Sequence, residues 1–300
     1  MNTGINEAQI SAVICKALNC EEKDINHIER IESGMTNRSF CFKVKDKKYI
    51  LRVPGEGASD MIDRNNEAIV YKTIRGLGFC DDPVYFDPVT GYKIAYYIDG
   101  VRSCDPHNED DVRQCMKKLK SFHEYLKDGK PLTVPHKFDI YERIDFYDSL
   151  WIGKSVNKDY ETVKENCLSL KTYIDKHKLP FQLCHIDSVA DNFLFDSKNN
   201  VQLTDWEYAG MQDRHVDIAM FCIYSLYNKE EVDKLIDIYF EGECDKQARI
   251  KIYCYIAICC LLWSNWSEYK NYLGIRFGEY GKRQYQYAKD YYEYAKENLR

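Results

Sequence analysis

The sequence lacks the features that mark membrane-spanning and nucleic-acid-binding proteins. The apolar stretch 256–263 is far shorter than the ~20 residues that a bilayer-spanning helix requires. Basic residues are not in excess, because 42 Lys and Arg face 48 Asp and Glu, for a net charge of −6. Binding to a nucleic-acid backbone depends on a basic surface that neutralises phosphates. We therefore expect neither a nucleic-acid partner nor association with a membrane.

The 13 cysteines include no Cys-x-x-Cys pair, the spacing that is typical of zinc sites and of redox-active dithiols. The first residues also lack a basic segment followed by an apolar one, so we expect no signal peptide. Scattered cysteines of this kind are typical of reduced thiols. We therefore expect a cytoplasmic protein, and the sequence leaves its oligomeric state open.

Secondary-structure patterns change character near Gly100. Before that residue, short β-like runs are expected at 27–32, 39–44, 49–53 and 92–98, with helices at 7–18 and 60–74. After it, helical periodicity covers 109–126, 140–150, 160–177 and most of the chain from residue 216 onward. The sequence thus predicts an α+β protein of two lobes, with a small β-rich lobe at 1–100 and a larger, mostly helical lobe at 101–300.

One polar motif carries the chemistry, namely His185-x-Asp187 with Asn192, followed by Asp205-x-Glu207. Phosphoryl transfer needs a nucleophile held in line and metal ions that neutralise the phosphates. A loop Asp can orient the acceptor hydroxyl, while an Asn and a second Asp can hold Mg²⁺ through oxygen atoms. Strands expected at 193–195 and 201–204 form a hairpin that would bring Asn192 and Asp205 together. The simpler alternative is a polar turn with solvated acids.

The string 205–211, together with Cys184-His185-x-Asp187, resembles the choline/ethanolamine kinase family. More broadly it resembles the aminoglycoside-phosphotransferase-like superfamily, which has a protein-kinase-like fold. The exact residues of the string 205–211 resemble those of bacterial choline kinases of the Lic type. The likeness runs from about Ile31 to the C-terminal helices. It implies that Asp187 is the catalytic base or orienting residue and that His185 orients the loop.

The same resemblance implies roles for the other polar residues of the motif. Asn192 and Asp205 would be Mg²⁺ ligands, and Glu207 would shape the metal or substrate site. Asp217 would brace the catalytic loop through hydrogen bonds to its backbone.

The segment 32–40 resembles the nucleotide loop of the family, although it lacks the Gly-Lys-Ser/Thr of a Walker A loop. Backbone N–H groups and small polar side chains suit phosphate oxygens. The residues expected to contact the nucleotide here are Gly34, Thr36, Asn37 and Ser39. Without the resemblance, an ordinary β-turn would be the simpler reading.

Arg52 lies where this family carries its phosphate-contacting basic residue, and Glu67 in the helix 60–74 is its expected ion-pair partner. A guanidinium can direct two donors to phosphate or carboxylate oxygens. The backbone of Tyr97 and Ile98 resembles the hinge that pairs with adenine. The implied cofactors are therefore ATP and Mg²⁺. The plainer alternatives are an exposed strand arginine, a solvated helix glutamate and an edge strand.

Aromatic residues mark the expected acceptor site. Trp263 and Trp266 lie three residues apart on one helix face, and Phe277 and Tyr280 follow, while Tyr208 adjoins the metal motif. A quaternary ammonium has no conventional donor, so proteins recognise it with aromatic faces, each worth about 0.5–2 kcal/mol. The pattern resembles the choline site of choline kinases. The alternative is a helix stripe packed into the core.

The predicted function is ATP-dependent phosphorylation of choline. One departure leaves ethanolamine open, because Phe221-Cys222 is followed by Ile223 where eukaryotic choline kinases often carry Glu. Kinases acting on an aminoglycoside, a methylthioribose or a thiamine are further alternatives within enzymes. A catalytically inactive kinase-like binding module is the alternative from another class, and the complete set of motif residues argues against it.

Overall fold

The computed structural model describes residues 5–31, 37–55, 62–151 and 155–299. They form two compact units that do not follow the chain order. The first unit contains the chain up to Ser103 together with Phe193–Tyr208, and the second contains Cys104–Asn192 and the chain from Ala209 onward. The first is built on an antiparallel sheet and the second is largely helical, which agrees with the predicted fold class.

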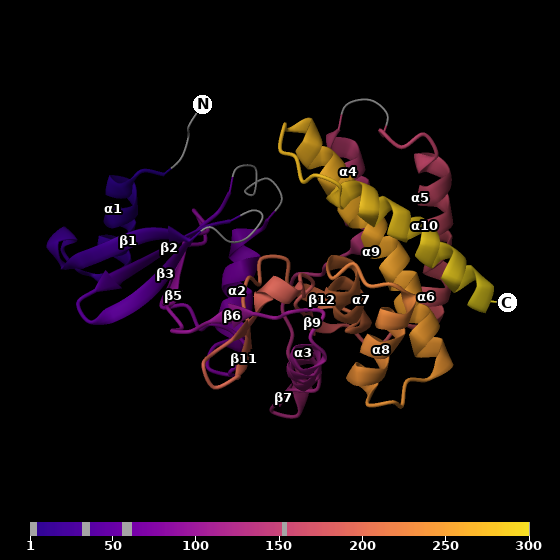
Figure 1. The fold of residues 1–300 in the computed structure, drawn as a ribbon, viewed down its shortest axis with the longest axis horizontal. Coiled ribbons are helices and arrows are strands. Elements are labelled where there is room, and N and C mark those ends of the chain that lie inside the picture. Colours follow the sequence, from indigo (N-terminus) through magenta and orange to yellow (C-terminus); the bar gives the residue numbers. More distant parts are fainter. Residues whose placement is uncertain (1–4, 32–36, 56–61, 152–154, 300) are drawn as a thin grey trace. The chain divides into compact units, whose positions relative to one another are not determined.

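The first unit is organised by a five-stranded antiparallel sheet (Figure 1). Its strand order is β1-β2-β3-β5-β4, where the strands are β1 (Ile25–Ile31), β2 (Arg38–Val44), β3 (Lys47–Val53), β4 (Tyr85–Phe86) and β5 (Lys93–Tyr96). Alternate residues of β2, such as Phe42, enter a core with Leu51 of β3. Ile10 and Ile14, four residues apart on helix α1 (Glu7–Leu18), pack into the same core. The sheet therefore has one face covered by α1.

Helix α2 (Arg64–Ile74) begins later than the predicted residue 60. Asp63 is its N-cap, and its side chain accepts hydrogen bonds from the backbone N–H groups of Asn65 and Asn66. Because a capping carboxylate satisfies N–H groups that the first turn leaves without partners, it defines where the helix starts. This cap places Arg64 and Glu67 in the first turn of α2.

A second, three-stranded sheet completes the first unit. Its order is β11-β10-β6, with β6 (Arg102–Ser103), β10 (Phe193–Phe195) and β11 (Val201–Leu203). The predicted hairpin is present, and Phe193 pairs with Leu203. Asp196 accepts the backbone N–H groups of Lys198 and Asn200, which fixes the turn. Because β11 pairs within this sheet, the residues that follow it, 204–208, also belong to the first unit.

The second unit is built around the long helix α9 (Lys246–Tyr272), with α10 (Tyr280–Asn298) packed along it (Figure 1). The other helices are α3 (Glu109–His123), α4 (Ile140–Leu150), α5 (Tyr160–Ser169), α6 (Lys171–His177), α7 (His215–Tyr224) and α8 (Lys229–Phe240). Helices α4, α5, α6 and α7 also contact α9. Nearly every residue of α9 from 250 to 267 is buried, which explains why its apolar stretch has no polar face.

Two predicted helices of this unit differ from the structure. The stretch 160–177 is two helices, because the N–H of Leu170 donates to the carbonyl of Cys167 and tightens the turn between them. The predicted helix 109–126 ends at His123, whose carbonyl accepts the side-chain amide of Gln182. Short strands β7 (Leu126–Lys127) and β8 (Lys130–Pro131) follow.

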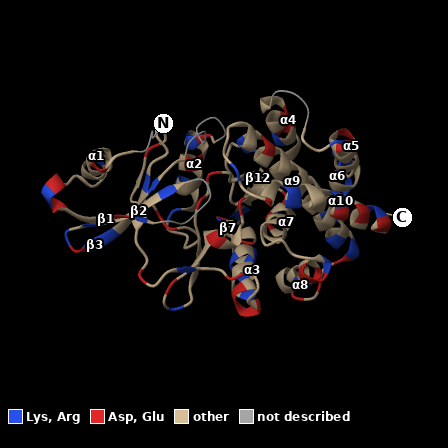
Figure 2. Cartoon of the chain, turned by 45° about the horizontal axis from the view of Figure 1, so that its top comes forward, with Lys and Arg blue, Asp and Glu red and all other residues tan. Residues whose placement is uncertain are grey.

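Strand β9 (Gln182–Cys184) pairs with β12 (Gly210–Gln212), and this ladder supports the loop that follows Cys184. The short 3₁₀ helices are η1 (Glu22–Asp24) and η2 (Ala190–Asn192). Acidic and basic residues are interspersed along helices such as α10 (Figure 2). Among the described residues, no helix is long and apolar enough to cross a membrane.

A buried ion pair ties α9 to the start of α7. The Lys251 ammonium donates to Asp213 at 2.7 Å and to the carbonyl of His177 at 2.8 Å. Asp213 also accepts the backbone N–H groups of Leu179 at 2.9 Å and His215 at 3.0 Å. Lys251 and Asp213 are 1% and 0% exposed, so each charge depends on these partners.

Candidate active site

The loop after β9 carries the predicted catalytic residue Asp187, and Asp217 at the start of α7 holds it in shape. The Asp217 carboxylate accepts the backbone N–H of His185 at 2.9 Å and that of Ile186 at 2.7 Å. Ile186 has φ 69°, a left-handed conformation that is rare for a β-branched residue and costs about 1–3 kcal/mol. The structure thus confirms the predicted bracing of the loop by Asp217.

Asn192 is joined to Asp187 within the second unit. Its side-chain Nδ2 donates to the Asp187 carbonyl at 2.8 Å and to Asp187 Oδ2 at 3.1 Å. Ser188 gives the same loop a further hydrogen bond, because its Oγ donates to the Asp217 carbonyl at 2.5 Å. His185 is fully buried, and its backbone N–H is one of the two that Asp217 accepts.

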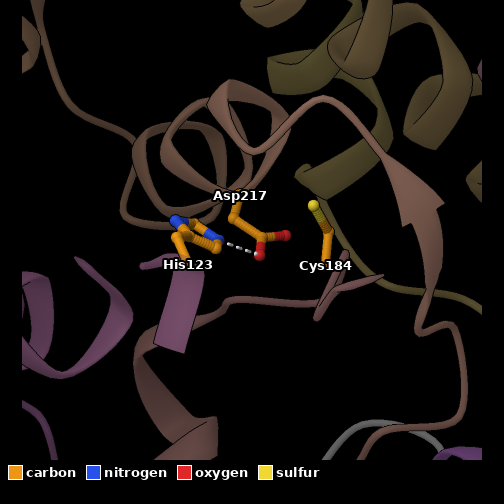
Figure 3. A group of neighbouring side chains, drawn as sticks. All are labelled: His123, Cys184 and Asp217. Carbon is orange, nitrogen blue, oxygen red and sulfur yellow. Dashed lines mark hydrogen bonds and ion pairs between the residues drawn. The ribbon is translucent and has the colours of Figure 1, made fainter. Parts of the chain in front are cut away.

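Asp217 belongs to a buried group of three side chains, whose other members are His123 and Cys184 (Figure 3). His123 Nε2 lies 2.9 Å from Asp217 Oδ2, and His123 Nδ1 lies 2.8 Å from the Tyr239 hydroxyl. The Cys184 thiol donates to the Gln212 carbonyl at 3.4 Å. One nitrogen, sulfur or carboxylate atom from each of His123, Cys184 and Asp217 lies within 4.8 Å of the others. The sequence spacing gave no signal for this group, since its members come from α3, β9 and α7.

In the first unit, the predicted ion pair of Arg52 with Glu67 is present, at 2.5 Å. The other arm of the same guanidinium is hydrogen-bonded to Asp205. Arg52 is 6% exposed and Glu67 is 0% exposed, so this pairing is screened little by solvent. Arg52 therefore links the sheet, α2 and the Asp205-x-Glu207 motif.

Arg64 is a site residue that the sequence analysis missed. Its Nη1 donates to Glu67 at 2.7 Å and to Glu207 at 2.9 Å. The signal was an arginine three residues before Glu67, a spacing that puts both side chains on one helix face. Two arginines and three carboxylates therefore form one buried charge cluster in the first unit, consisting of Arg52, Arg64, Glu67, Asp205 and Glu207.

Asn37 is the part of the predicted nucleotide loop that joins this cluster. Its Nδ2 donates to Asp205 at 2.9 Å and to Glu207 at 3.4 Å. Ser39 lies on β2 directly opposite Arg52 in the strand register. Gly34 and Thr36 lie outside the described residues.

The two motif carboxylates differ in electrostatics. Burial, and then the charge of Asp205, raise the pKa of Glu207 to about 7. Burial also opposes ionisation of Asp205, but the guanidinium of Arg52 outweighs it and lowers the pKa of Asp205 below its usual value. Asp205 has φ 61°, so its backbone is also in the left-handed region. Asp205 is therefore the more readily ionised member of the pair.

Lys93 on β5 is a second buried cation that sequence reasoning missed. Its ammonium donates to Asp81 at 2.6 Å, to the Tyr71 hydroxyl at 2.9 Å and to Thr204 at 3.3 Å. Thr204 immediately precedes Asp205, and the positive charge of Lys93 also helps to lower the pKa of Asp205. Lys93 is the register partner of Arg52 in the pairing of β3 with β5, so both cations support the motif from the same face of the sheet.

The segment predicted to pair with adenine follows β5. The backbone N–H of Tyr97 donates to the Lys48 carbonyl at 3.1 Å, and the Ile98 carbonyl accepts the N–H of Val101 at 3.3 Å. Strand β5 ends at Tyr96, two residues before the predicted end. Tyr97 and Ile98 therefore lie in irregular backbone just after the end of β5.

Four of the five predicted aromatic residues form one group in the second unit. The rings of Trp263 and Trp266 are 5.9 Å apart, and Trp266 stacks on Phe277 at 5.0 Å and meets Tyr280 edge-on at 6.3 Å. Tyr224 on α7, which the sequence analysis did not identify, lies 5.8 Å from Trp263 and stacks on Tyr280 at 6.5 Å.

Tyr280 is the member of this aromatic group whose pKa is shifted most clearly. Burial, and then the charge of Asp187, raise the pKa of Tyr280 well above its ordinary value. Asp187 and the aromatic group both belong to the second unit. Tyr208 is a buried residue of the first unit, and its predicted part in the acceptor site stays a prediction.

Gly91 gives a test of the charge cluster. A Cβ at this position would lie 2.7 Å from Arg64 Nε and 2.8 Å from Pro54 Cγ. We expect Gly91→Ala to lower the free energy of unfolding by about 1–3 kcal/mol more than Gly76→Ala, because Arg64 is held by two ion pairs and cannot retreat. Gly76 has the same φ of 72°, but no described atom lies within 4 Å of its added Cβ. Urea titrations of both variants give the comparison, and equal losses would contradict the close packing of Arg64.

Comparison with known proteins identifies the class. Residues 27–253 match the phosphotransferase enzyme family (APH), and the chain belongs to that family. The crystal structure of choline kinase LicA from Streptococcus pneumoniae is similar, with a TM-score of 0.82 and 27% identity over 96% of this chain and 99% of that one. LicA in complex with AMP gives a TM-score of 0.81 and 26% identity, covering 97% of this chain and 100% of that one.

A third solved structure is a choline/ethanolamine kinase family protein from Mesorhizobium loti. It has a TM-score of 0.71 and 25% identity, over 91% of this chain and 87% of that one. Together with the site, these likenesses make the chain a choline/ethanolamine kinase-like, ATP-dependent phosphotransferase.

Proposed function

We propose that the protein transfers the terminal phosphoryl group of ATP to the hydroxyl of choline, giving phosphocholine and ADP. The observation that carries the proposal is the aromatic group of the second unit, the unit that also contains Asp187. A cationic alcohol needs both parts, aromatic faces for its ammonium and a carboxylate for its hydroxyl. The similarity to a structure described as a choline kinase supports the same substrate.

Asp187 accepts a hydrogen bond from the choline hydroxyl and aligns its oxygen with the terminal phosphorus. A bond forms between that oxygen and phosphorus while the bond from phosphorus to the ADP oxygen breaks, and the hydroxyl proton passes to Asp187 or through it to solvent. The Asn192 amide, which donates to Asp187, fixes the direction of the carboxylate. His185 contributes by orienting the loop.

Arg52 provides the phosphate-contacting guanidinium, with Glu67 holding it in place. Asn37 and Ser39, the latter on β2, are proposed to contact the phosphates together with Gly34 and Thr36. The backbone of Tyr97 and Ile98 is proposed to meet the adenine. The similarity to a structure of LicA with AMP supports a nucleotide site of this kind.

Asp205 and Asn192, with Glu207 nearby, are the residues that would hold Mg²⁺. All three offer oxygen atoms, the ligands that this hard cation prefers. Asn192 uses its Nδ2 on Asp187, which leaves its oxygen for another partner. Asp205 is kept charged by Arg52, so the donor set fits a divalent cation. When bound, Mg²⁺ supplies neutralisation of the charge that develops on the phosphates.

The choice of choline rests on cation recognition by aromatic faces. The Lys270 ammonium lies 5.7 Å from the centroid of the Trp266 ring, which supports the ability of this ring to accept a cation. Both Trp263 and Trp266 are almost fully buried, whereas Phe277 and Tyr280 are partly exposed. Desolvated rings are those at which a cation–π contact is strongest, at about 2 kcal/mol.

Trp263 provides a direct test with two substitutions. We expect Trp263→Leu to raise the KM for choline about tenfold or more, and Trp263→Phe to raise it less, because phenylalanine retains an aromatic face. Both variants should leave the KM for ATP within about twofold, as ATP does not use the aromatic group. Steady-state kinetics with each substrate varied in turn give these values. Equal choline KM values for the two variants would show that shape, and not the π-face, matters here.

Ethanolamine is the second candidate, since Ile223 is buried and supplies no carboxylate beside the aromatic group. The deciding experiment measures ADP release from ATP and Mg²⁺ with choline, ethanolamine, kanamycin or no acceptor. Turnover with choline well above that with ethanolamine supports the proposal. Preference for ethanolamine would retain the transfer site and reject the aromatic recognition of the ammonium, and activity with kanamycin or with no acceptor would reject both.

A further inference from the structure

The buried contacts of His123 extend the catalytic loop support to a fourth element, helix α8. His123 on α3 is 3% exposed, Asp217 on α7 is 0% exposed and Tyr239 on α8 is 3% exposed. His123 Nε2 lies 2.9 Å from Asp217 (Figure 3). His123 Nδ1 lies 2.8 Å from the Tyr239 hydroxyl, so His123 bridges the other two residues. The imidazole therefore has a partner on both nitrogens.

The chemistry of these partners determines where the protons lie. An ionised carboxylate such as that of Asp217 can only accept, so His123 Nε2 must carry a proton and donate it. The Tyr239 hydroxyl is buried, and within the described residues its hydrogen-bond partner is His123 Nδ1. A buried hydroxyl that fails to donate loses a hydrogen bond at a cost, so Tyr239 donates and Nδ1 accepts. The geometry thus favours a neutral His123 with its proton on Nε2.

His123, Cys184 and Asp217 do not form a metal centre, although one possible ligand atom from each lies within 4.8 Å of the others. The Cys184 thiol donates to the Gln212 carbonyl, and both oxygens of Asp217 are occupied by backbone N–H groups and His123. A metal ion would have to displace these bonds and to deprotonate a thiol that is fully buried. The group is better explained as a support built from hydrogen bonds.

We infer that Tyr239 is a positioning residue for catalysis, which acts through His123 and Asp217 on the backbone of the Asp187 loop. The hydroxyl of Tyr239 selects the tautomer that donates to Asp217, and Asp217 holds Ile186 in its left-handed conformation one residue before Asp187. This inference rests on the proposed role of Asp187. It adds that the position of Asp187 depends on a side chain of α8 that touches neither substrate.

The first measurement is the tautomer of His123, read from its ¹⁵N chemical shifts in ¹H–¹⁵N correlation spectra of the full chain, with His123→Gln used for assignment. We expect a neutral ring with its proton on Nε2 in the native protein and a mixture of tautomers in Tyr239→Phe. This readout needs no acceptor substrate, so it stands or falls independently of the proposed function. An imidazolium, a proton on Nδ1, or a metal ion in native mass spectra that is lost in His123→Gln would each overturn the inference.

The second measurement is kinetic. We expect Tyr239→Phe to lower kcat about three- to tenfold while both KM values stay within about twofold, since one supporting hydrogen bond is lost and no substrate contact changes. Tyr291→Phe is the matched control, because Tyr291 is also a buried tyrosine of the second unit, at 2% exposure on α10. An unchanged kcat in Tyr239→Phe, or an equal loss in Tyr291→Phe, would refute the positioning role.

A rescue variant separates positioning from simple destabilisation. The amide of glutamine can donate to Asp217 without selection by Tyr239, so Tyr239→Phe should have little further effect on kcat in a His123→Gln background. If the two substitutions lower kcat independently, Tyr239 does not act through His123. If the wild-type protein transfers phosphate to none of the tested acceptors, the proposed function fails while the tautomer measurement still tests the hydrogen-bond chain.

Discussion

Replacing Asp187 with alanine is expected to lower choline-dependent ADP formation about a thousandfold or more, while ATP binding stays nearly intact. The variant removes the group proposed to align the hydroxyl and accept its proton, and such groups contribute roughly 10²–10⁴ in rate. The nucleotide-binding residues proposed here lie in the first unit and do not include Asp187. Turnover is measured by coupled ADP release, and ATP affinity is measured by calorimetry without acceptor.

Asp191→Ala is the control for this substitution, since Asp191 is an exposed acid four residues further along the same loop. It should retain nearly full activity. Asp187→Asn keeps the shape and a hydrogen-bonding oxygen, so it should recover some alignment but little proton acceptance. Retained turnover in Asp187→Ala would remove Asp187 from the mechanism, whereas loss of ATP affinity would place it at the nucleotide instead.

Lys251→Met is expected to have the largest effect on stability, lowering the free energy of unfolding by about 3–5 kcal/mol. The substitution leaves the Asp213 carboxylate buried without its cation, although the N–H groups of Leu179 and His215 remain. Since whole proteins are stable by only about 5–15 kcal/mol, this is a large share of the total. Urea denaturation followed by circular dichroism gives the value.

Lys246→Met is the matched control for this variant, because Lys246 is an exposed lysine in the first turn of the same helix. It should change the stability by less than about 0.5 kcal/mol. The double variant Lys251→Met/Asp213→Asn should lose less than the sum of the two single variants, because it removes both charges together. A loss in Lys251→Met no larger than in Lys246→Met would contradict the importance of the ion pair.

Much of the fold could be predicted because local signals agreed with the final structure. The helix at 7–18 and the hairpin at 193–203 were anticipated closely, since the first shows amphipathic periodicity and the second has a turn rich in polar residues. The start of α2 was not, because the cap Asp63 competes with the equally plausible Asp60 in the sequence. The break at Leu170 depends on packing within the second unit and has no proline or glycine to announce it.

The site was predictable where residues are close in sequence or belong to a resemblance. The Arg52–Glu67 pair and the bracing by Asp217 are present as expected. His123 and Tyr239 were missed because their contacts join residues far apart in the sequence. His123 is 94 residues from Asp217 and 116 residues from Tyr239. A lone histidine on a helix has too many ordinary explanations for periodicity to single it out. Contacts of this kind depend on tertiary packing alone.

The first unit is assembled from two separate segments of the chain, which affects how the chain folds during synthesis. Strands β10 and β11 and Asp205 belong to that unit, yet they are translated about 90 residues after β6, their partner in the sheet. Until they emerge from the ribosome, the guanidinium of Arg52 lacks Asp205 and the ammonium of Lys93 lacks Thr204. The amino-terminal part therefore cannot reach its final form first and wait for the rest. The nascent chain must already hold much of the second unit when the first one closes.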